Sequence, residues 1–189
     1  SGQLTRTLSM TDTMFMTSRD GYTWNRQNEA YITPGPEYQA NWIYGNCYPA
    51  YGLIETAADH PDADRELSTY LFEGKFYKAP SVFYRYSFRL DGFKSYKGNM
   101  TSQKVTTKVL TFDGSQLYIN FKTSAAGSVK VNILDENGKA MEGYSSALLI
   151  GDNTDRQVIF ENDLSQLNGT NVVIEFVLTD AEVYSFKFQ

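Results

Sequence analysis

Apolar and polar side chains alternate in short segments through the C-terminal half of the chain, and this period of two constrains the fold more than any other feature. Every second side chain of such a segment lies on one face, which is typical of a β-strand with one buried and one solvated side. Roughly seven or eight short strands in about 90 residues, separated by Gly, Asn and Asp turns, predict an antiparallel β-sandwich of jelly-roll or lectin-like type over residues 91–189. We expect its core to contain Leu117, Ile119, Phe121, Val131, Ile133, Ile174 and Phe176.

One segment of this half departs from the alternation and predicts a helical turn at residues 163–167. The side chain of Asp163 can accept a hydrogen bond from the first free backbone N–H groups of such a turn. Gly169 lies just past its end, where a residue with positive φ is favoured. We therefore expect Asp163 to be the N-cap of a single turn.

Residues 1–90 have longer irregular loops and contain most of the Trp, Pro and Met residues. They predict a propeller-blade-like β-meander, which we place as a first domain ahead of the sandwich at 91–189. Its first hairpin is expected to run from a strand at 14–17 to a returning strand at 29–32. Further strands are expected at 52–56, 67–72, 75–77 and 82–90.

Charge and metal-ligating residues argue against several classes of function. The net charge is −5, and Lys and Arg are scattered singly, so we expect no nucleic-acid partner. The single Cys47 permits no internal disulfide, and the single His60 excludes multi-histidine metal sites. We expect no cofactor and no metal. We also expect no membrane span, because no apolar run approaches the roughly 18 residues that a span needs. A chain that starts at Ser1 without an initiator Met is expected to be a processed or recombinant fragment.

The segment from residue 18 to residue 24 carries the pattern S-x-D-G-x-x-W, formed by Ser18, Asp20, Gly21 and Trp24. It resembles a hairpin that recurs in the blades of β-propeller glycosidases of the invertase, arabinanase and levansucrase type, and it is similar to a shortened sialidase Asp-box. The resemblance implies that Asp20 and Gly21 form the turn and that Trp24 packs under a blade. The motif therefore marks a propeller blade and not a catalytic centre.

The resemblance extends over nearly the whole chain, to the last blades and the following β-sandwich of uncharacterised bacterial relatives of those glycosidases. It implies the C-terminal part of an exported protein from polysaccharide-degrading bacteria, with a periplasmic or extracellular location. A five-bladed propeller takes roughly 300 residues, so most blades and at least one catalytic Asp are expected to be missing from a chain of 189 residues. The similar segments lie at 15–21, 34–37, 41–45, 52–56, 66–68, 89–93, 123–129, 150–152 and 180–186.

Glu55 is the best catalytic candidate, because it ends an apolar strand soon after an aromatic cluster. Carboxylates beside aromatic rings are used to bind sugars and to raise the pKa of a catalytic acid. The alternative is a strand-end Glu in a surface pair. The cluster itself predicts a sugar-binding platform, against the alternative that its rings are packing residues. The predicted ligand-binding residues are Trp42, Tyr44, Asn46, Tyr48 and Tyr51.

The sequence leaves three functions open. The first is a carbohydrate-associated C-terminal fragment of a glycoside hydrolase that is inactive alone. The second is a non-catalytic carbohydrate-binding module, and the third is a purely structural β-sandwich that supports a propeller. The expected partners are a poly- or oligosaccharide and, because open blade edges favour pairing, either the missing N-terminal blades or a second copy of the chain.

Overall fold

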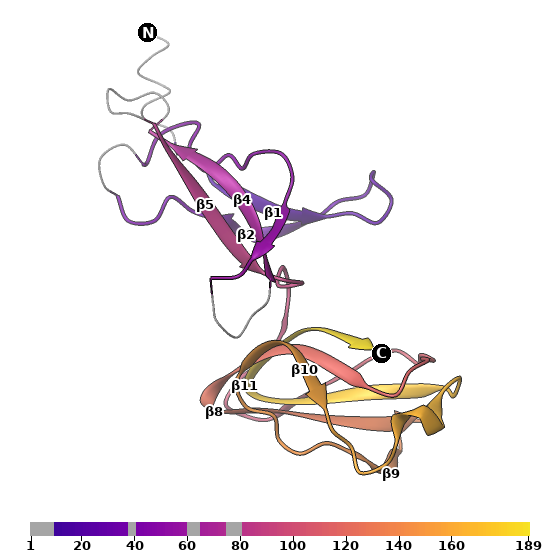
Figure 1. Cartoon of the computed structure of the whole chain (residues 1–189). Helices are drawn as coiled ribbons and strands as arrows, with labels where there is room; N and C mark the ends of the chain where they lie inside the picture. The colour runs from indigo at the N-terminus through magenta and orange to yellow at the C-terminus, as the bar shows by residue number, and fades with distance from the viewer. Residues whose placement is uncertain (1–9, 38–40, 60–64, 75–80) are drawn as a thin grey trace. The chain divides into compact units, whose positions relative to one another are not determined.

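The computed structural model shows an all-β chain, with antiparallel sheets and no α-helix among the described residues, which confirms the predicted fold class. The chain divides into two compact units, shown in Figure 1, and the main division lies between Phe88 and Arg89. The N-terminal unit comprises Ser1–Ala57 and Glu66–Phe88, and the C-terminal unit comprises Ala58–Arg65 and Arg89–Gln189. The described residues are 10–37, 41–59, 65–74 and 81–189.

Two long strands, β8 and β11, organise the C-terminal unit and pair with each other along nearly their whole length. They hold the central positions of one sheet with the order β10-β8-β11-β6, while β9 pairs with β8 and β7 pairs with β11. Long central strands thus replace several of the short strands that the sequence predicts. The strands are β6 (Tyr96–Gly98), β7 (Gln103–Thr106), β8 (Leu117–Asp135), β9 (Ala140–Ser145), β10 (Asp152–Val158) and β11 (Val172–Phe188).

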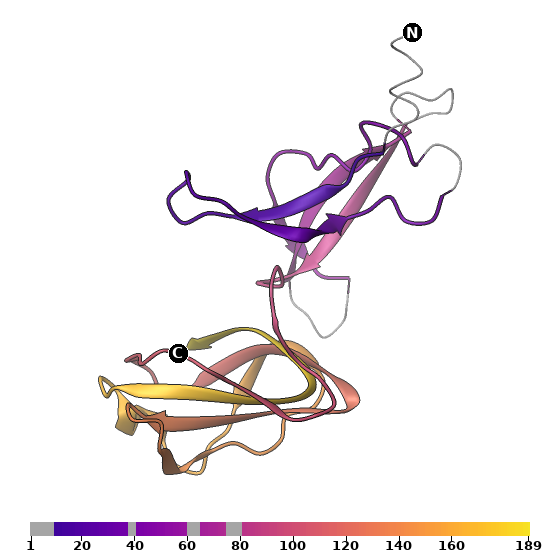
Figure 2. The ribbon, with the colours of Figure 1, turned by 180° about the vertical axis from the view of Figure 1, so that it is seen from behind.

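A break in the pairing of β8 with β11 divides each long strand into two halves. Figure 2 shows the ribbon from behind. Ser128 pairs with Thr179, but the next pair joins Thr123 to Ala181, so four residues of β8 lie opposite Asp180 alone. Asp180 has a positive φ of 41°. A Cβ atom at Gly127 would lie 2.3 Å from the carbonyl oxygen of Asp180, so only glycine allows this approach. The break lets one pair of strands serve both halves of a sandwich-like fold.

The core of the C-terminal unit confirms the predicted alternation. The seven expected core residues are all buried, and Leu117, Val131 and Ile174 have no exposed surface at all. Phe112 and Phe188 stack at the edge of this core with ring centroids 4.0 Å apart. The alternation holds in both halves of β8 because the break leaves the buried face on odd-numbered residues.

The predicted helical turn is present as a 3-10 helix at Leu164–Leu167, with Asp163 as its N-cap. The Asp163 carboxylate accepts a hydrogen bond from the Ser165 N–H at 2.9 Å, which lowers the pKa of that carboxyl. Gly169 follows with a φ of 70° and donates its N–H to the carbonyl oxygen of Phe112. The turn is therefore held at both ends.

The N-terminal unit contains two small sheets and a small core. Within the described part of the chain, its buried apolar cluster consists of Ile32, Cys47 and Leu71, with Tyr31, Tyr86 and Phe88 packed against it. The predicted strand at 75–77 and the position of His60 lie outside the described residues. The sheets are β1-β2 and β3-β4-β5, formed by β1 (Thr13–Thr17), β2 (Asn25–Ile32), β3 (Ile54–Ala57), β4 (Arg65–Glu73) and β5 (Val82–Arg89).

The predicted hairpin joins β1 to β2, and its turn is built around Asp20. The Asp20 carboxylate accepts hydrogen bonds from the N–H groups of Thr23 and Tyr22, which hold its pKa far below the ordinary range. Gly21 adopts the positive φ of 77° that the turn requires. Trp24, however, keeps 56% of its surface exposed, so the expectation that it packs under a blade is not met in this chain. The strand that follows is longer than predicted and starts at Asn25.

Candidate functional site

A groove of about 540 Å³ at the surface of the C-terminal unit is the candidate ligand site. Its floor contains Phe176, Leu178 and Val183, which are also buried members of the core. The break at Asp180 separates the first two of these residues from the third, so both halves of β11 contribute to one concavity. We call this feature the β11 groove.

Two aromatic side chains of the β11 groove remain accessible to a ligand. Tyr96 of β6 is 66% exposed and Phe186 of β11 is 36% exposed. The Phe186 ring packs against Phe176, with ring centroids 5.7 Å apart, so its position is set by the core. Tyr96 is positioned by β6, which approaches β11 closely: a Cβ atom at Gly98 would lie 2.6 Å from the Leu178 Cβ. The groove therefore presents aromatic surface on a rigid base.

Hydroxyl groups and one ammonium group accompany these rings. Thr106, Thr107, Ser185 and Lys108 also line the groove. The backbone of Thr107 is fixed because its N–H donates to the Ile174 carbonyl oxygen, while its Oγ1 accepts from the Ile174 N–H, both at 3.0 Å. A mostly apolar concavity with a few fixed polar groups is the usual form of a small-ligand site.

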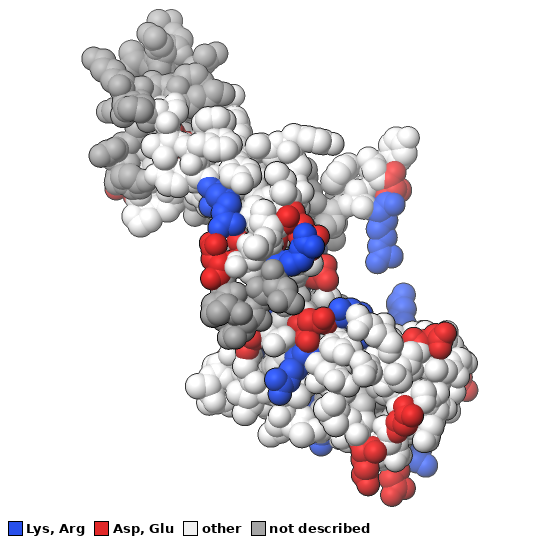
Figure 3. Space-filling model, viewed as in Figure 1, with Lys and Arg blue, Asp and Glu red and all other residues white. Residues whose placement is uncertain are grey.

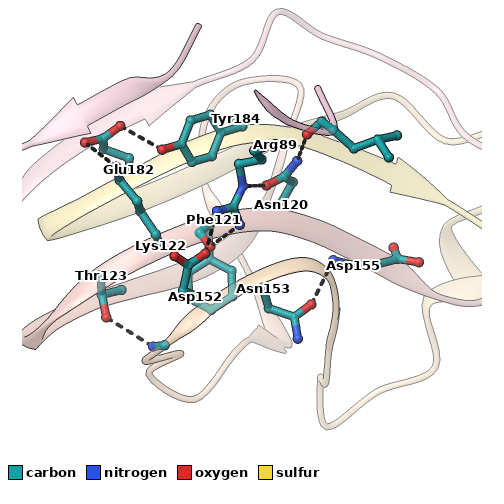
Figure 4. A network of polar contacts seen from close by, with 12 residues as sticks. Arg89, Asn120, Phe121, Lys122, Thr123, Asp152, Asn153, Asp155, Glu182 and Tyr184 are labelled. Atoms are coloured by element: carbon teal, nitrogen blue, oxygen red, sulfur yellow. Dashed lines mark hydrogen bonds and ion pairs between the residues drawn. The ribbon is translucent and has the colours of Figure 1, made fainter. Parts of the chain in front are cut away.

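Arg89 lies against Tyr184, a further residue of the groove (Figure 4). The guanidinium carbon of Arg89 lies 4.7 Å from the centre of the Tyr184 ring. Arg89 Nε donates to Asn120 Oδ1 at 2.6 Å, and Nη2 donates to the Phe121 carbonyl oxygen at 3.1 Å. Nη1 forms an ion pair with Asp152. This network connects the start of the C-terminal unit to β8, β10 and β11.

Glu182 anchors the hydroxyl group of the same tyrosine. Tyr184 Oη donates to Glu182 Oε2 at 3.0 Å, Ser95 Oγ donates to the same oxygen at 2.8 Å, and the Lys122 ammonium lies 3.5 Å from Oε1. Burial alone would raise the pKa of Glu182, but these hydrogen bonds and the lysine outweigh it and lower the pKa below its ordinary value. Burial is the largest cause that raises the pKa of Tyr184. This polar network holds Tyr184 in the groove wall.

The predicted aromatic platform lies in the N-terminal unit, in the loop that precedes β3. Trp42, Tyr44 and Tyr48 are each about two-fifths to one-half exposed, and Tyr51 is fully exposed. The indole N–H of Trp42 donates to the Gly35 carbonyl oxygen at 2.8 Å. Tyr44 and Tyr48 meet edge to face with ring centroids 6.2 Å apart. These rings are accessible, so the platform stays a prediction that binding measurements can test.

The other two predicted residues of this region lie in different environments. Asn46 is 1% exposed, and its amide group donates to the Asn41 carbonyl oxygen and accepts from the Gly74 N–H. These bonds stabilise the loop and leave Asn46 with no surface to offer a ligand. Glu55 occupies an exposed position of β3. A catalytic role of Glu55 stays a prediction from the sequence.

Comparisons of this chain with protein-family models, curated proteins and solved structures gave no match. Among the described residues, no His, Cys, Asp and Glu side chains gather into a group of three that could hold a metal ion. The described part of the chain also contains no helix with the length and apolar character that a membrane crossing needs. A functional proposal for this chain therefore depends on the geometry of the β11 groove.

Proposed function

We propose that the C-terminal unit is a non-catalytic carbohydrate-binding module and that the β11 groove is its sugar site. The observation that carries the proposal is the combination of two accessible rings, Tyr96 and Phe186, with hydroxyl groups in one concavity. The C–H faces of a sugar ring pack on aromatic rings, while its hydroxyl groups exchange hydrogen bonds with polar side chains at the rim. Thr106 and Ser185 are the rim side chains that could make such bonds.

The composition of the groove favours binding over hydrolysis. Glycoside hydrolysis commonly uses two carboxyl groups on either side of the scissile bond, roughly 5 to 9.5 Å apart. No Asp or Glu is among the described residues that line the β11 groove. A sugar in this position would be held by stacking and hydrogen bonds without an acid to protonate the leaving group.

The wider proposal, that the chain is the C-terminal part of a glycoside hydrolase acting outside the cytoplasm, rests on the resemblance of its motifs. A sugar-binding sandwich is consistent with that proposal, since such a unit would keep a catalytic domain on its polysaccharide. The role of the N-terminal unit as blade strands belongs to the same proposal. Under that proposal, activity of Glu55 would require further propeller blades.

Affinity electrophoresis of the full chain through gels containing soluble polysaccharides tests the proposal. We expect at least one polysaccharide to retard the wild type and Tyr96→Ala to weaken binding roughly 3- to 10-fold, the range expected for loss of one stacking ring. Tyr22→Ala is the matched control, because Tyr22 is a 92% exposed tyrosine of the N-terminal unit. If Tyr96→Ala binds as tightly as the wild type and Tyr51→Ala does not bind, the sugar site lies on the predicted platform. No retardation by any polysaccharide would contradict the proposal.

A further inference from the structure

The described lining of the β11 groove carries a single positive charge. Of the described residues that line it, only Lys108 has an ionised side chain. The chain as a whole has a net charge of −5, and Figure 3 shows blue and red side chains interspersed over the face in view. A groove with an ammonium group and no carboxylate of its own therefore differs from the average surface of this protein.

The lysines around the groove differ in whether a carboxylate neutralises them. Lys104 of β7 is paired with Glu175 at 2.9 Å. Lys122 and Lys97 both lie near Glu182. Lys108 forms no ion pair with any described residue and is exposed. Its ammonium group is therefore available to a ligand.

Two carboxylates form hydrogen bonds with residues that line the groove and add negative charge near it. Asp91 Oδ2 accepts a hydrogen bond from Ser185 at 3.3 Å, and Glu182 accepts one from Tyr184. Neither carboxylate lines the groove. The charge of Glu182 is offset by Lys122 and Lys97, whereas the charge of Asp91 remains next to Ser185. Among the described residues, Lys108 is the only charged side chain on the lining itself.

We propose that the β11 groove selects acidic sugars, in which a carboxylate or sulfate group pairs with Lys108 while the sugar ring stacks on Tyr96. This inference rests on the proposed carbohydrate-binding function. An ion pair at the edge of an apolar concavity is screened less than one in open water, so it can discriminate between charged and neutral ligands. Both bonds of Thr107 to Ile174 fix the backbone next to Lys108, so the lysine side chain extends from a defined position on the groove lining.

The test measures binding of the full chain to pairs of glycans that share a backbone and differ only in charge. The probes are a polyuronate and its fully methyl-esterified form, and a sulfated polysaccharide and its desulfated form. We expect the acidic member of at least one pair to bind and Lys108→Gln to weaken that binding roughly 3- to 10-fold, with Lys108→Arg retaining most of it. Raising the salt concentration should reduce binding of the wild type more than that of Lys108→Gln. Which pair responds distinguishes carboxylate from sulfate recognition.

Lys139→Gln is the matched control, because Lys139 is an exposed lysine in the turn between β8 and β9 and is not part of the groove. Binding of neutral glycans alone would overturn the preference for acidic sugars and leave the proposed function intact. The same holds if Lys108→Gln and Lys139→Gln bind the acidic probe as tightly as the wild type. Absence of binding to any glycan would contradict both proposals.

Discussion

The guanidinium group of Arg89 stacks over the ring of Tyr184, and its nitrogens bind the side chain of Asn120 and the backbone of Phe121. One side chain at the first position of the Arg89–Gln189 segment of the C-terminal unit thus contacts a wall residue of the β11 groove and two neighbouring residues of β8. The side chain is only 19% exposed, so its partners would not be fully rehydrated if it were lost. The groove and the stability of the unit are therefore coupled through Arg89.

Replacing Arg89 should destabilise the C-terminal unit. We expect Arg89→Ala to lower the free energy of unfolding by about 2 kcal/mol, because buried acceptors lose their charged donor. Denaturant unfolding measures the loss. Arg156→Ala, at an exposed position of β10, should change stability by less than about 0.5 kcal/mol. Equal effects of the two substitutions would show that the Arg89 contacts do not contribute.

Core packing should dominate the stability of the same unit. Phe176 is 4% exposed in the centre of the cluster formed by β8 and β11, so Phe176→Ala should cost about 3 to 5 kcal/mol through lost burial and a residual cavity. Tyr96→Ala removes an exposed ring and should cost less than about 1 kcal/mol. Thermal and denaturant unfolding of both variants provides the comparison. A cost below about 1 kcal/mol for Phe176→Ala would argue against the observed register.

Acid should destabilise the protein in part through Glu182. The pKa of this carboxyl is lowered from its ordinary value of 4.5, so the folded state favours the charged form more than the unfolded chain does. Its contribution is fully present above about pH 4.5 and is lost as the pH falls through the lower pKa of the folded state. Stability measured as a function of pH should therefore decline less steeply below pH 4.5 in Glu182→Gln than in the wild type. The exposed Glu142→Gln is the control, and a Glu182→Gln profile parallel to the wild type would refute this role.

The two units should differ when expressed separately. Residues 89–189 contain the large core and should melt cooperatively as a monomer. The described part of residues 1–90 buries few apolar side chains, and within it β5 is the last strand of its sheet, with Val82, Phe83 and Tyr84 exposed. This fragment should therefore associate or melt without cooperativity. Calorimetry with sedimentation measures both properties. A monomeric, cooperatively melting 1–90 fragment would show that it needs no further strands.

Much of the fold was accessible from the sequence because it depends on local patterns. Alternation identified the buried face of β8 and β11, and Asp163 was recognisable as a cap because capping depends on residues adjacent in the chain. The same patterns did not reveal that β8 and β11 are long strands with a break at Gly127. That feature depends on a close approach between Gly127 and Asp180, which are 53 positions apart.

The candidate site was less accessible for the same reason. Tyr96, Lys108 and Phe186 come from three separate segments and meet only through strand pairing with β11. No local signal in the sequence marks Lys108 as a groove residue. Sequence reasoning instead favoured the loop around Trp42, where several aromatic residues are close in the chain. Among those residues Asn46 is buried by loop hydrogen bonds, which depend on the partners Asn41 and Gly74.

Sugar binding in the β11 groove is tested most directly by titrating the isotopically labelled full chain with an oligosaccharide from the most strongly retained polysaccharide. Backbone amide chemical shifts follow the titration. We expect the largest shift changes to cluster at the β11 groove, at Tyr96, Lys108 and Ser185, and Tyr96→Ala to weaken the apparent affinity. Changes confined to the loop from Trp42 to Glu55, or saturable binding that leaves the groove amides unmoved, would contradict sugar binding in the groove.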